Sequence, residues 1–229
     1  MSNVLNLRQD RRVAFLGGTG REGSALALRF AAANWAVSIG SRDRARAEEK
    51  ASELRQRAGT VDVSGGANLD VAAQGGLVFL CVPFDNAAAL LTDCRNQWQP
   101  GTIVVDTTVP LQFDKQCGAV LLALEDNSGS ERLAKLVPSD VPLVAGFKTI
   151  PAHVLGALHE SLDCDVIICG DDAEARTRVM EAARDLTGLR PLDGGPLRHA
   201  RALEAMCAMV IGLNRRYKSK GARFRVVGI

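Results

Sequence analysis

The chain has 229 residues, of which 47% are hydrophobic and 24% are charged. A chain of this length can bury about 70% of its unfolded surface, so its core needs no disulfide or metal. The 28 Lys and Arg residues against 26 Asp and Glu leave a formal net charge of +2, too little for a general nucleic-acid or membrane binder. The longest apolar stretches, 76–84 and 205–213, are about half a membrane span, and residues 1–12 lack the apolar segment of a signal peptide. We therefore expect a cytoplasmic protein with no nucleic-acid or membrane partner.

Strand and helix patterns alternate along almost the whole chain. Short apolar runs bounded by glycine or proline predict strands, at 12–16, 35–39, 61–63, 76–82, 102–106, 142–147, 165–169 and 189–192. Apolar residues at helical spacing predict helices, at 23–33, 44–57, 86–95, 130–137, 173–186 and 197–217. Residues 107–127 carry no clear pattern and are expected to be irregular. The alternation predicts a Rossmann-type, doubly wound α/β fold with a mostly parallel sheet and a small C-terminal helical segment.

The acidic and thiol residues argue against a metal site. Six cysteines, at positions 81, 94, 117, 164, 169 and 207, include no CxxC pair and no histidine at zinc-finger spacing. We expect them to be reduced, buried thiols. Asp171 and Asp172 are adjacent carboxylates between a predicted strand and a predicted helix, where such residues usually cap the helix instead of holding a metal.

A glycine-rich segment follows the first predicted strand and opens the first predicted helix. It fits the pattern GxGxxG, which in this context predicts a dinucleotide-binding loop. Gly18 would make the tight turn, Gly20 would let a pyrophosphate approach the backbone, and Gly23 would let the helix pack on the strand. A glycine turn without a ligand is the alternative. The residues expected to bind the cofactor are Gly18, Thr19, Gly20, Arg21, Glu22 and Gly23.

The end of the second predicted strand indicates which dinucleotide is bound. NAD-binding proteins usually carry Asp or Glu there, whereas this chain has Ser41 and Arg42. An arginine can hold the 2′-phosphate of NADP through two parallel hydrogen bonds, and a carboxylate would repel it. Arg46 lies one helical turn beyond Arg42, although Arg44 and Arg46 could alternatively be solvated residues of an exposed helix. The sequence therefore predicts NADP(H).

The same segments carry a resemblance to a known family. The chain resembles the NADPH-dependent coenzyme F420 reductases, or F420:NADP oxidoreductases, from about residue 11 to residue 214. The similar blocks are Val13–Gly20, Ala25–Arg29, Gly40–Arg42, Thr149–Ala152, Cys169–Asp172, Gly188–Asp193 and Gly195–Leu197, with Arg201 and Glu204 in the last helix.

The resemblance implies hydride transfer between NADPH and F420, an 8-hydroxy-5-deazaflavin with an anionic tail. It further implies that residues 1–160 form an NADP-binding Rossmann domain and that residues 161–229 close the pocket of the second substrate. By its motifs, Thr19, Ser41, Arg42 and Arg46 would surround the 2′-phosphate. The other residues would lie beside the nicotinamide and the deazaflavin, namely Val82, Pro83, Ile150, Ala152 and, near the C-terminal helix, Cys207.

Lys148 departs from the family pattern, as relatives carry His or Asn there. It would either stabilise negative charge on the reduced deazaflavin or lie on the surface at a strand end. The segment 107–127 also matches the family poorly, so both departures concern the second substrate more than the fold.

No acid–base pair for an alcohol dehydrogenase is recognisable, since the histidines at 153, 159 and 199 and the tyrosine at 217 lie in no catalytic motif. Hydride exchange between two ring cofactors mainly requires that the protein position them. Two alternatives stay open: an NADPH-dependent reductase of flavin, ferric chelate or another small acceptor, and a non-enzymatic NADP(H) sensor. The basic residues from Arg198 onward would form either a solvated tail or a binding site for the anionic arm of the coenzyme. The apolar residues 205–213 in the same stretch could form a homodimer interface.

Overall fold

The computed structural model describes residues 11–115 and 118–229. Cys117 lies outside the described residues, as do residues 1–10, which make up most of the segment 1–12 considered above for a signal peptide. The main sheet contains β1 (Arg12–Leu16), β2 (Ala36–Ser41), β3 (Val63–Ala67), β4 (Leu77–Leu80), β5 (Ile103–Asp106), β8 (Leu143–Ala145), β9 (Cys164–Gly170) and β10 (Leu189–Asp193). A separate hairpin contains β6 (Leu111–Asp114) and β7 (Gly118–Leu121).

The eight strands lie in the order β10-β9-β8-β5-β4-β1-β2-β3, and only the β8–β9 pair is antiparallel. The part β3-β2-β1-β4-β5-β8 has the strand order of a dinucleotide-binding sheet. The order reverses between β1 and β4, which is where such sheets bind their ligands. The predicted Rossmann-type fold is therefore confirmed.

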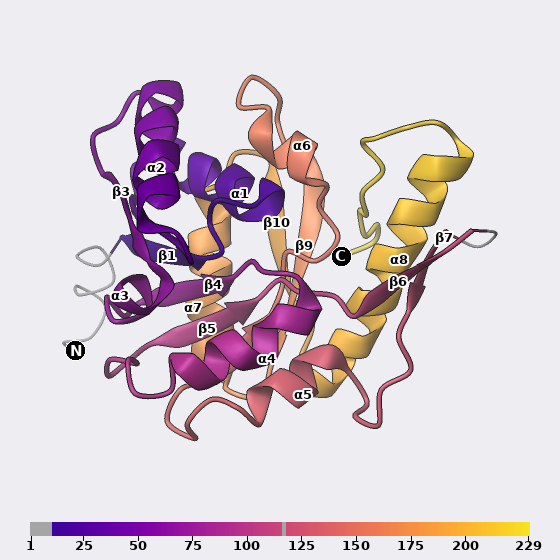
Figure 1. The fold of residues 1–229 in the computed structure, drawn as a ribbon. Coiled ribbons are helices and arrows are strands. Elements are labelled where there is room, and N and C mark those ends of the chain that lie inside the picture. The colour runs from indigo at the N-terminus through magenta and orange to yellow at the C-terminus, as the bar shows by residue number, and fades with distance from the viewer. Residues whose placement is uncertain (1–10, 116–117) are drawn as a thin grey trace, which may run out of the picture.

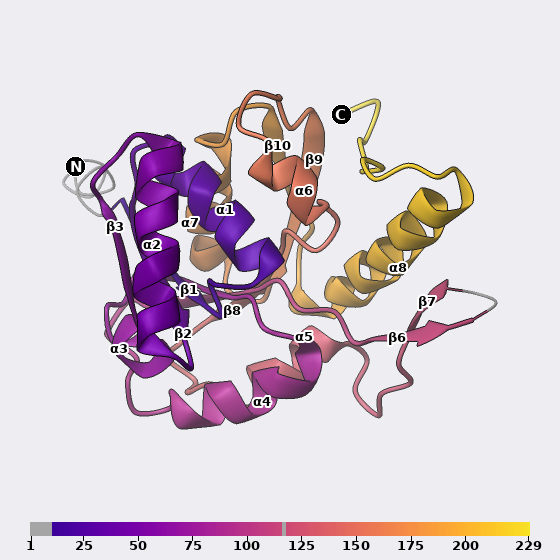
Figure 2. The ribbon, with the colours of Figure 1, turned by 45° about the horizontal axis from the view of Figure 1, so that its top comes forward.

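Helices cover both faces of the sheet (Figure 1). One apolar core lies under α1 (Arg21–Ala32), α2 (Arg44–Ala58), α6 (Ala152–Gly156) and α7 (Ala173–Arg184). The other lies under α3 (Asn68–Ala72), α4 (Phe84–Asp93), α5 (Gly129–Ala134) and α8 (Ala200–Arg216), which follows a 3₁₀ turn at Leu197–His199. The β6–β7 hairpin lies beside α8 at the periphery, as Figures 1 and 2 both show. No helix in the described part of the chain is long and apolar enough to cross a membrane.

The third strand differs from its prediction. It was expected at 61–63 but runs over Val63–Ala67, and Val61 is 84% exposed. Its glycines conceal it in the sequence, because glycine is unfavourable in strands. A Cβ at Gly65 would lie 2.4 Å from the backbone of Ala47 in α2, so the close helix requires glycine there.

The segment 107–127 is also more regular than expected, because it contains the β6–β7 hairpin. Phe113 in β6 is 76% exposed, and β7 packs on α8 rather than on the main sheet. The short helices α3 and α6 were not predicted either, and α5 ends at Ala134 instead of reaching 137. These elements are too short to show a helical period.

A buried arginine joins α1 to α6. The guanidinium of Arg29, which is 5% exposed, donates hydrogen bonds to the carbonyls of Val154, Leu155, Ala157 and Glu160 at 2.6–3.0 Å. The carbonyls of Val154, Leu155 and Ala157 lie at the C-terminal end of α6, where the helix dipole is negative, and that of Glu160 follows in the next turn. The contact fixes the segment that follows the sequence Thr-Ile-Pro-Ala.

The described cysteines are all free thiols, as expected. Cys94, Cys164 and Cys169 are buried, whereas Cys81 and Cys207 are only partly buried. The expectation of burial is therefore wrong for these two: Cys81 lines the pocket beside the glycine-rich loop, and Cys207 lies on a half-buried part of α8.

Candidate active site

The glycine-rich loop connects β1 to α1 and fits tightly against its neighbours. A Cβ at Gly18 would lie 1.9 Å from Cγ2 of Ile39, and one at Gly23 would lie 2.9 Å from the carbonyl oxygen of Gly17. Gly20 is the N-cap of α1, and the nearest atom to a Cβ there would be 3.3 Å away. The loop therefore holds the first turn of α1 against the sheet and leaves backbone N–H groups at its N-terminus for an anion.

A pocket of about 450 Å³ opens beside this loop, at the C-terminal ends of β1, β2 and β4. It brings together seven of the residues predicted from sequence, namely Thr19, Gly20, Ser41, Arg42, Arg46, Val82 and Pro83. Arg44 is not among the lining residues and instead pairs with Asp70 at the surface. Arg42 and Arg46 are exposed cations at the second-strand end of the pocket, where the sequence predicts the 2′-phosphate.

Asn68 is a pocket residue that the sequence reasoning missed. Its side-chain oxygen accepts a hydrogen bond from the backbone N–H of Gly17 at 3.1 Å. A Cβ at Gly40 would lie 2.5 Å from that same oxygen. Asn68 thus links the end of β3 to the glycine loop, and the glycine before Ser41 makes room for it.

The remaining predicted residues lie outside this pocket. Gly18 and Gly23 are buried beneath the loop, and Arg21 is exposed at the start of α1. Ile150 is buried in the core under α1, against which Ala152 also packs. Asp172 caps α7 through the N–H of Ala175 at 2.8 Å, as predicted. Asp171 does not cap that helix and instead accepts a hydrogen bond from the N–H of Leu197 at 2.9 Å.

A buried polar cluster lies beyond the end of β5. The carboxylate of Asp106 is inaccessible to solvent and accepts hydrogen bonds from the N–H and hydroxyl of Thr108 at 2.9 and 2.7 Å. It also accepts one from the hydroxyl of Ser130 at 2.6 Å and one from the ammonium of Lys148 at 2.7 Å. The cluster therefore connects the ends of β5 and β8 with α5.

The side chain of Lys148 is fully buried, so the surface alternative considered for it is wrong. Its ammonium donates to Asp106 and to the carbonyl of Thr108. Burial beside Asp106 was not visible in the sequence, because the two residues are 42 positions apart. The position of Asp106 at the C-terminal end of a parallel strand was the available signal, since functional groups gather at that edge.

Glu204 attaches α8 to this cluster. Its carboxylate accepts hydrogen bonds from the backbone N–H groups of Gly129 and Ser130, both at 3.1 Å. Burial raises the pKa of Glu204, and Lys148 opposes that shift. Cys207, one turn further along α8, is only partly buried and interacts electrostatically with Lys148; burial raises its pKa to about 12.

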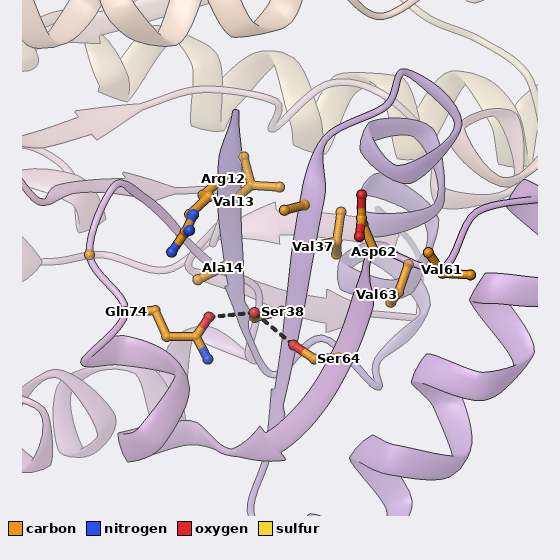
Figure 3. A pocket seen from close by; sticks show the side chains of 12 residues that line it. Arg12, Val13, Ala14, Val37, Ser38, Val61, Asp62, Val63, Ser64 and Gln74 are labelled. Atoms are coloured by element: carbon orange, nitrogen blue, oxygen red, sulfur yellow. Dashed lines mark hydrogen bonds between the residues drawn. The ribbon is translucent and has the colours of Figure 1, made fainter. Parts of the chain in front are cut away.

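The other large cavity lies at the opposite edge of the sheet. It has a volume of about 310 Å³ and is lined by residues near the starts of β1, β2 and β3 (Figure 3). Three of its polar side chains bond to one another, as the hydroxyl of Ser38 is joined to Gln74 and, at 2.9 Å, to Ser64. Because ligands of doubly wound sheets bind at the carboxyl ends of the strands, the glycine-loop pocket is the better candidate. Within the described ranges, no group of His, Cys, Asp and Glu side chains could hold a metal ion.

The strand order, the glycine loop and the pocket at the reversal point place the chain in the Rossmann class. Residues 12–110 match the family described as NADP oxidoreductase, coenzyme F420-dependent. The F420-dependent NADP reductases of Methanocaldococcus jannaschii and Methanothermobacter thermautotrophicus are each 34% identical over 222 residues, which cover 95% of this chain and 99% and 95% of theirs. The chain belongs to the F420-dependent NADP reductase family.

A solved structure agrees with this assignment. It comes from Arthrobacter sp. FB24, is described provisionally as an F420-dependent NADP reductase, and has 25% sequence identity with this chain. The two superpose with a TM-score of 0.77 over 94% of this chain and 99% of that one.

Proposed function

We propose that this protein is an oxidoreductase that transfers a hydride between NADPH and the deazaflavin coenzyme F420. The observation that carries the proposal is the pocket in which the glycine loop meets Arg42 and Arg46 at the switch point of the sheet. The curated relatives, which match over nearly the whole chain, are named for these two coenzymes. No observation favours the flavin, ferric-chelate or sensor alternatives.

NADP(H) would lie along the carboxyl ends of β1, β2 and β4. The N–H groups at the start of α1, behind Thr19 and Gly20, would hold the pyrophosphate. Ser41, Arg42 and Arg46 would bind the 2′-phosphate, since a guanidinium forms two parallel hydrogen bonds with phosphate oxygens. The other residues assigned to the bound dinucleotide are Arg21, Val82, Pro83, Ile150 and Ala152, with Gly18 and Gly23 shaping the loop. Glu22, which the sequence also predicts there, does not line the pocket.

The deazaflavin would lie over the nicotinamide, between the buried cluster and α8. Lys148 and Cys207 would border it, with Lys148 fixing the floor of the pocket through Asp106. In this arrangement residues 1–160 bind NADP(H) and residues 161–229, through α8, close the second pocket. When bound, the two coenzymes supply the hydride chemistry, and the protein positions them and excludes water.

We also propose a cytoplasmic homodimer. The hairpin and α8 pack together and expose several large apolar side chains, namely Phe113, Met209, Leu213 and Tyr217. Exposed apolar groups gathered on adjacent elements are typical of an association surface. Sedimentation at micromolar concentration should give twice the chain mass of 24.4 kDa, and a monomer would contradict this proposal.

The function is tested by offering the purified protein NADPH together with F420, FMN, FAD or ferric chelate. Oxidation of NADPH should require F420, and deuterium at C4 of the nicotinamide should arrive at C5 of the deazaflavin without loss to solvent. Rapid reduction of flavin or ferric chelate, with none of F420, would overturn the proposal.

A further inference from the structure

One acidic side chain of the glycine loop is directed away from the dinucleotide pocket. Glu22 lies in the first turn of α1 but is not among the residues that line the pocket. It instead shares a hydrogen bond with the side chain of Thr107 and interacts electrostatically with Lys148 and Asp106. Glu22 therefore lies between the glycine loop and the buried cluster, on the side where we place the second coenzyme.

The side chain of Thr107 fixes the place of the Glu22 carboxyl group. The hydroxyl of Thr107 lies 2.9 Å from the carbonyl oxygen of Leu80 and 3.6 Å from the sulfur of Cys81. Its hydrogen bond to the carboxyl group favours the charged form, since it lowers the pKa of Glu22. Thr107 therefore holds the carboxyl group near the ends of β4 and β5, beside Asp106 and Lys148.

The surroundings of Glu22 favour its neutral form. Burial, with a smaller effect of Asp106, raises the pKa of Glu22 from 4.5 to about 7 against the opposing effects of Lys148 and the Thr107 hydrogen bond. The cation of Lys148 is engaged by Asp106 at 2.7 Å, which limits the help it gives to a second carboxylate. The group therefore exchanges its proton near neutral pH, where a general acid–base group is most effective.

Hydride transfer from NADPH to F420 does not balance without a proton. The C4–H bond of the nicotinamide breaks with its electron pair, a C5–H bond forms on the deazaflavin, and NADPH becomes NADP⁺. The reduced ring also takes up one proton, on N1. A nearby carboxyl group can supply it in one direction and accept it in the other.

We propose that Glu22 is the acid–base residue that delivers this proton to the deazaflavin and removes it in the reverse reaction. The inference rests on the proposed function. Thr107 would orient the carboxyl group, and the Asp106–Lys148 pair would set its surroundings. The titratable groups that face Glu22 are Cys81 after β4, Asp106 at the end of β5, Lys148 after β8 and Cys207 on α8. Burial raises the pKa values of both thiols well above neutrality, so Glu22 is the group that changes charge near pH 7.

The first test uses the protein without coenzymes. Protein labelled with ¹³C at the Glu side-chain carboxyl should show one resonance that titrates near pH 7, and Glu22→Gln should remove it. Glu49→Gln, at an exposed position on α2, is the matched control and should keep it. A Glu22 resonance that titrates near pH 4.5 would overturn the inference.

The second test uses turnover in both directions. With NADPH and F420, kcat/KM of the unmodified protein should fall as pH rises through about 7, because the acid form is required. With NADP⁺ and reduced F420, it should fall as pH is lowered through the same range. Glu22→Gln should remove the bend near pH 7 from both profiles, leaving only the pH dependence that proton uptake by the overall reaction imposes, and should lower the rate by about 100-fold or more where the unmodified protein is fastest.

Substitution of a residue with only a structural role would lower the rates but would leave the bend near pH 7 in both profiles. If the unmodified protein turns over F420 and Glu22→Gln keeps that bend, the inference is wrong while the proposed function stands. If the unmodified protein does not turn over F420 at all, both are wrong.

Discussion

The buried pair of Asp106 and Lys148 leads to a prediction about stability in which the two single substitutions differ. Lys148→Met removes the cation but leaves the Asp106 carboxylate with three donors, at 2.6, 2.7 and 2.9 Å. Hydrogen bonds to a charged group are worth about 1.5–3 kcal/mol each, so the remaining carboxylate stays well solvated by the protein. We expect this variant to lose about 2 kcal/mol of unfolding free energy, which is less than the about 3–5 kcal/mol of a buried pair broken without such donors.

Asp106→Asn should cost more. It removes the negative charge and leaves the fully buried ammonium of Lys148 with the carbonyl of Thr108 as its other partner. Breaking a buried pair in this way costs about 3–5 kcal/mol, because an uncompensated charge remains. The double variant removes both charges, so its loss should be smaller than the sum of the two single losses by more than about 1 kcal/mol.

Urea unfolding at pH 7, followed by the fluorescence of Trp35 and Trp98, measures these differences. The control is Lys135→Met, which breaks an ion pair with Asp126 in which Lys135 is largely exposed, and which should cost less than about 1 kcal/mol. A greater loss for Lys148→Met than for Asp106→Asn, or strictly additive losses, would refute the reasoning.

Two other substitutions test the phosphate site and the attachment of α6. Arg42→Ala should lower the affinity for NADPH at least about tenfold and leave the affinity for NADH nearly unchanged, since a charge-assisted contact is worth about 1.5–3 kcal/mol. Calorimetry with both dinucleotides measures the two affinities, and Arg44→Ala is the control. Equal losses of affinity for NADPH and NADH would contradict the assignment. Arg29→Met should lower the unfolding free energy by about 3 kcal/mol, because four carbonyls at 2.6–3.0 Å lose their donor; a loss below about 1 kcal/mol in urea unfolding would show that water replaces the guanidinium.

The features that the sequence predicted are those with a short-range signal. The buried strands β1 and β4 are continuous apolar runs, and Gly18 and Gly23 stand at the spacing that a strand–turn–helix requires. Arg42 follows β2 directly, so its place at the pocket could be inferred from the end of one strand. Such signals survive because the residues concerned are close in the chain or belong to one periodic element.

The features that were missed depend on contacts between distant segments. The glycines of β3 are explained by the backbone of α2, which a strand pattern does not contain. Asp106 and Lys148 pair across 42 positions, and Glu204 joins the same region from α8. No local pattern distinguishes a lysine that will be buried beside a carboxylate from one at the surface, so Lys148 could not be assigned from its position after β8.

The first turn of α1 connects the two halves of the proposed reaction. Its backbone N–H groups face the dinucleotide pocket, where the positive end of the helix dipole favours a phosphate. Its Glu22 side chain is directed to Thr107 and the buried cluster, where burial favours the neutral acid over the anion that the dipole alone would favour. Because this turn packs so closely on the loop that a Cβ at Gly23 would lie 2.9 Å from the carbonyl oxygen of Gly17, the carboxyl group is fixed relative to the dinucleotide site. A displacement of α1 should therefore disturb NADP(H) binding and proton exchange together, whereas Glu22→Gln should affect the second alone.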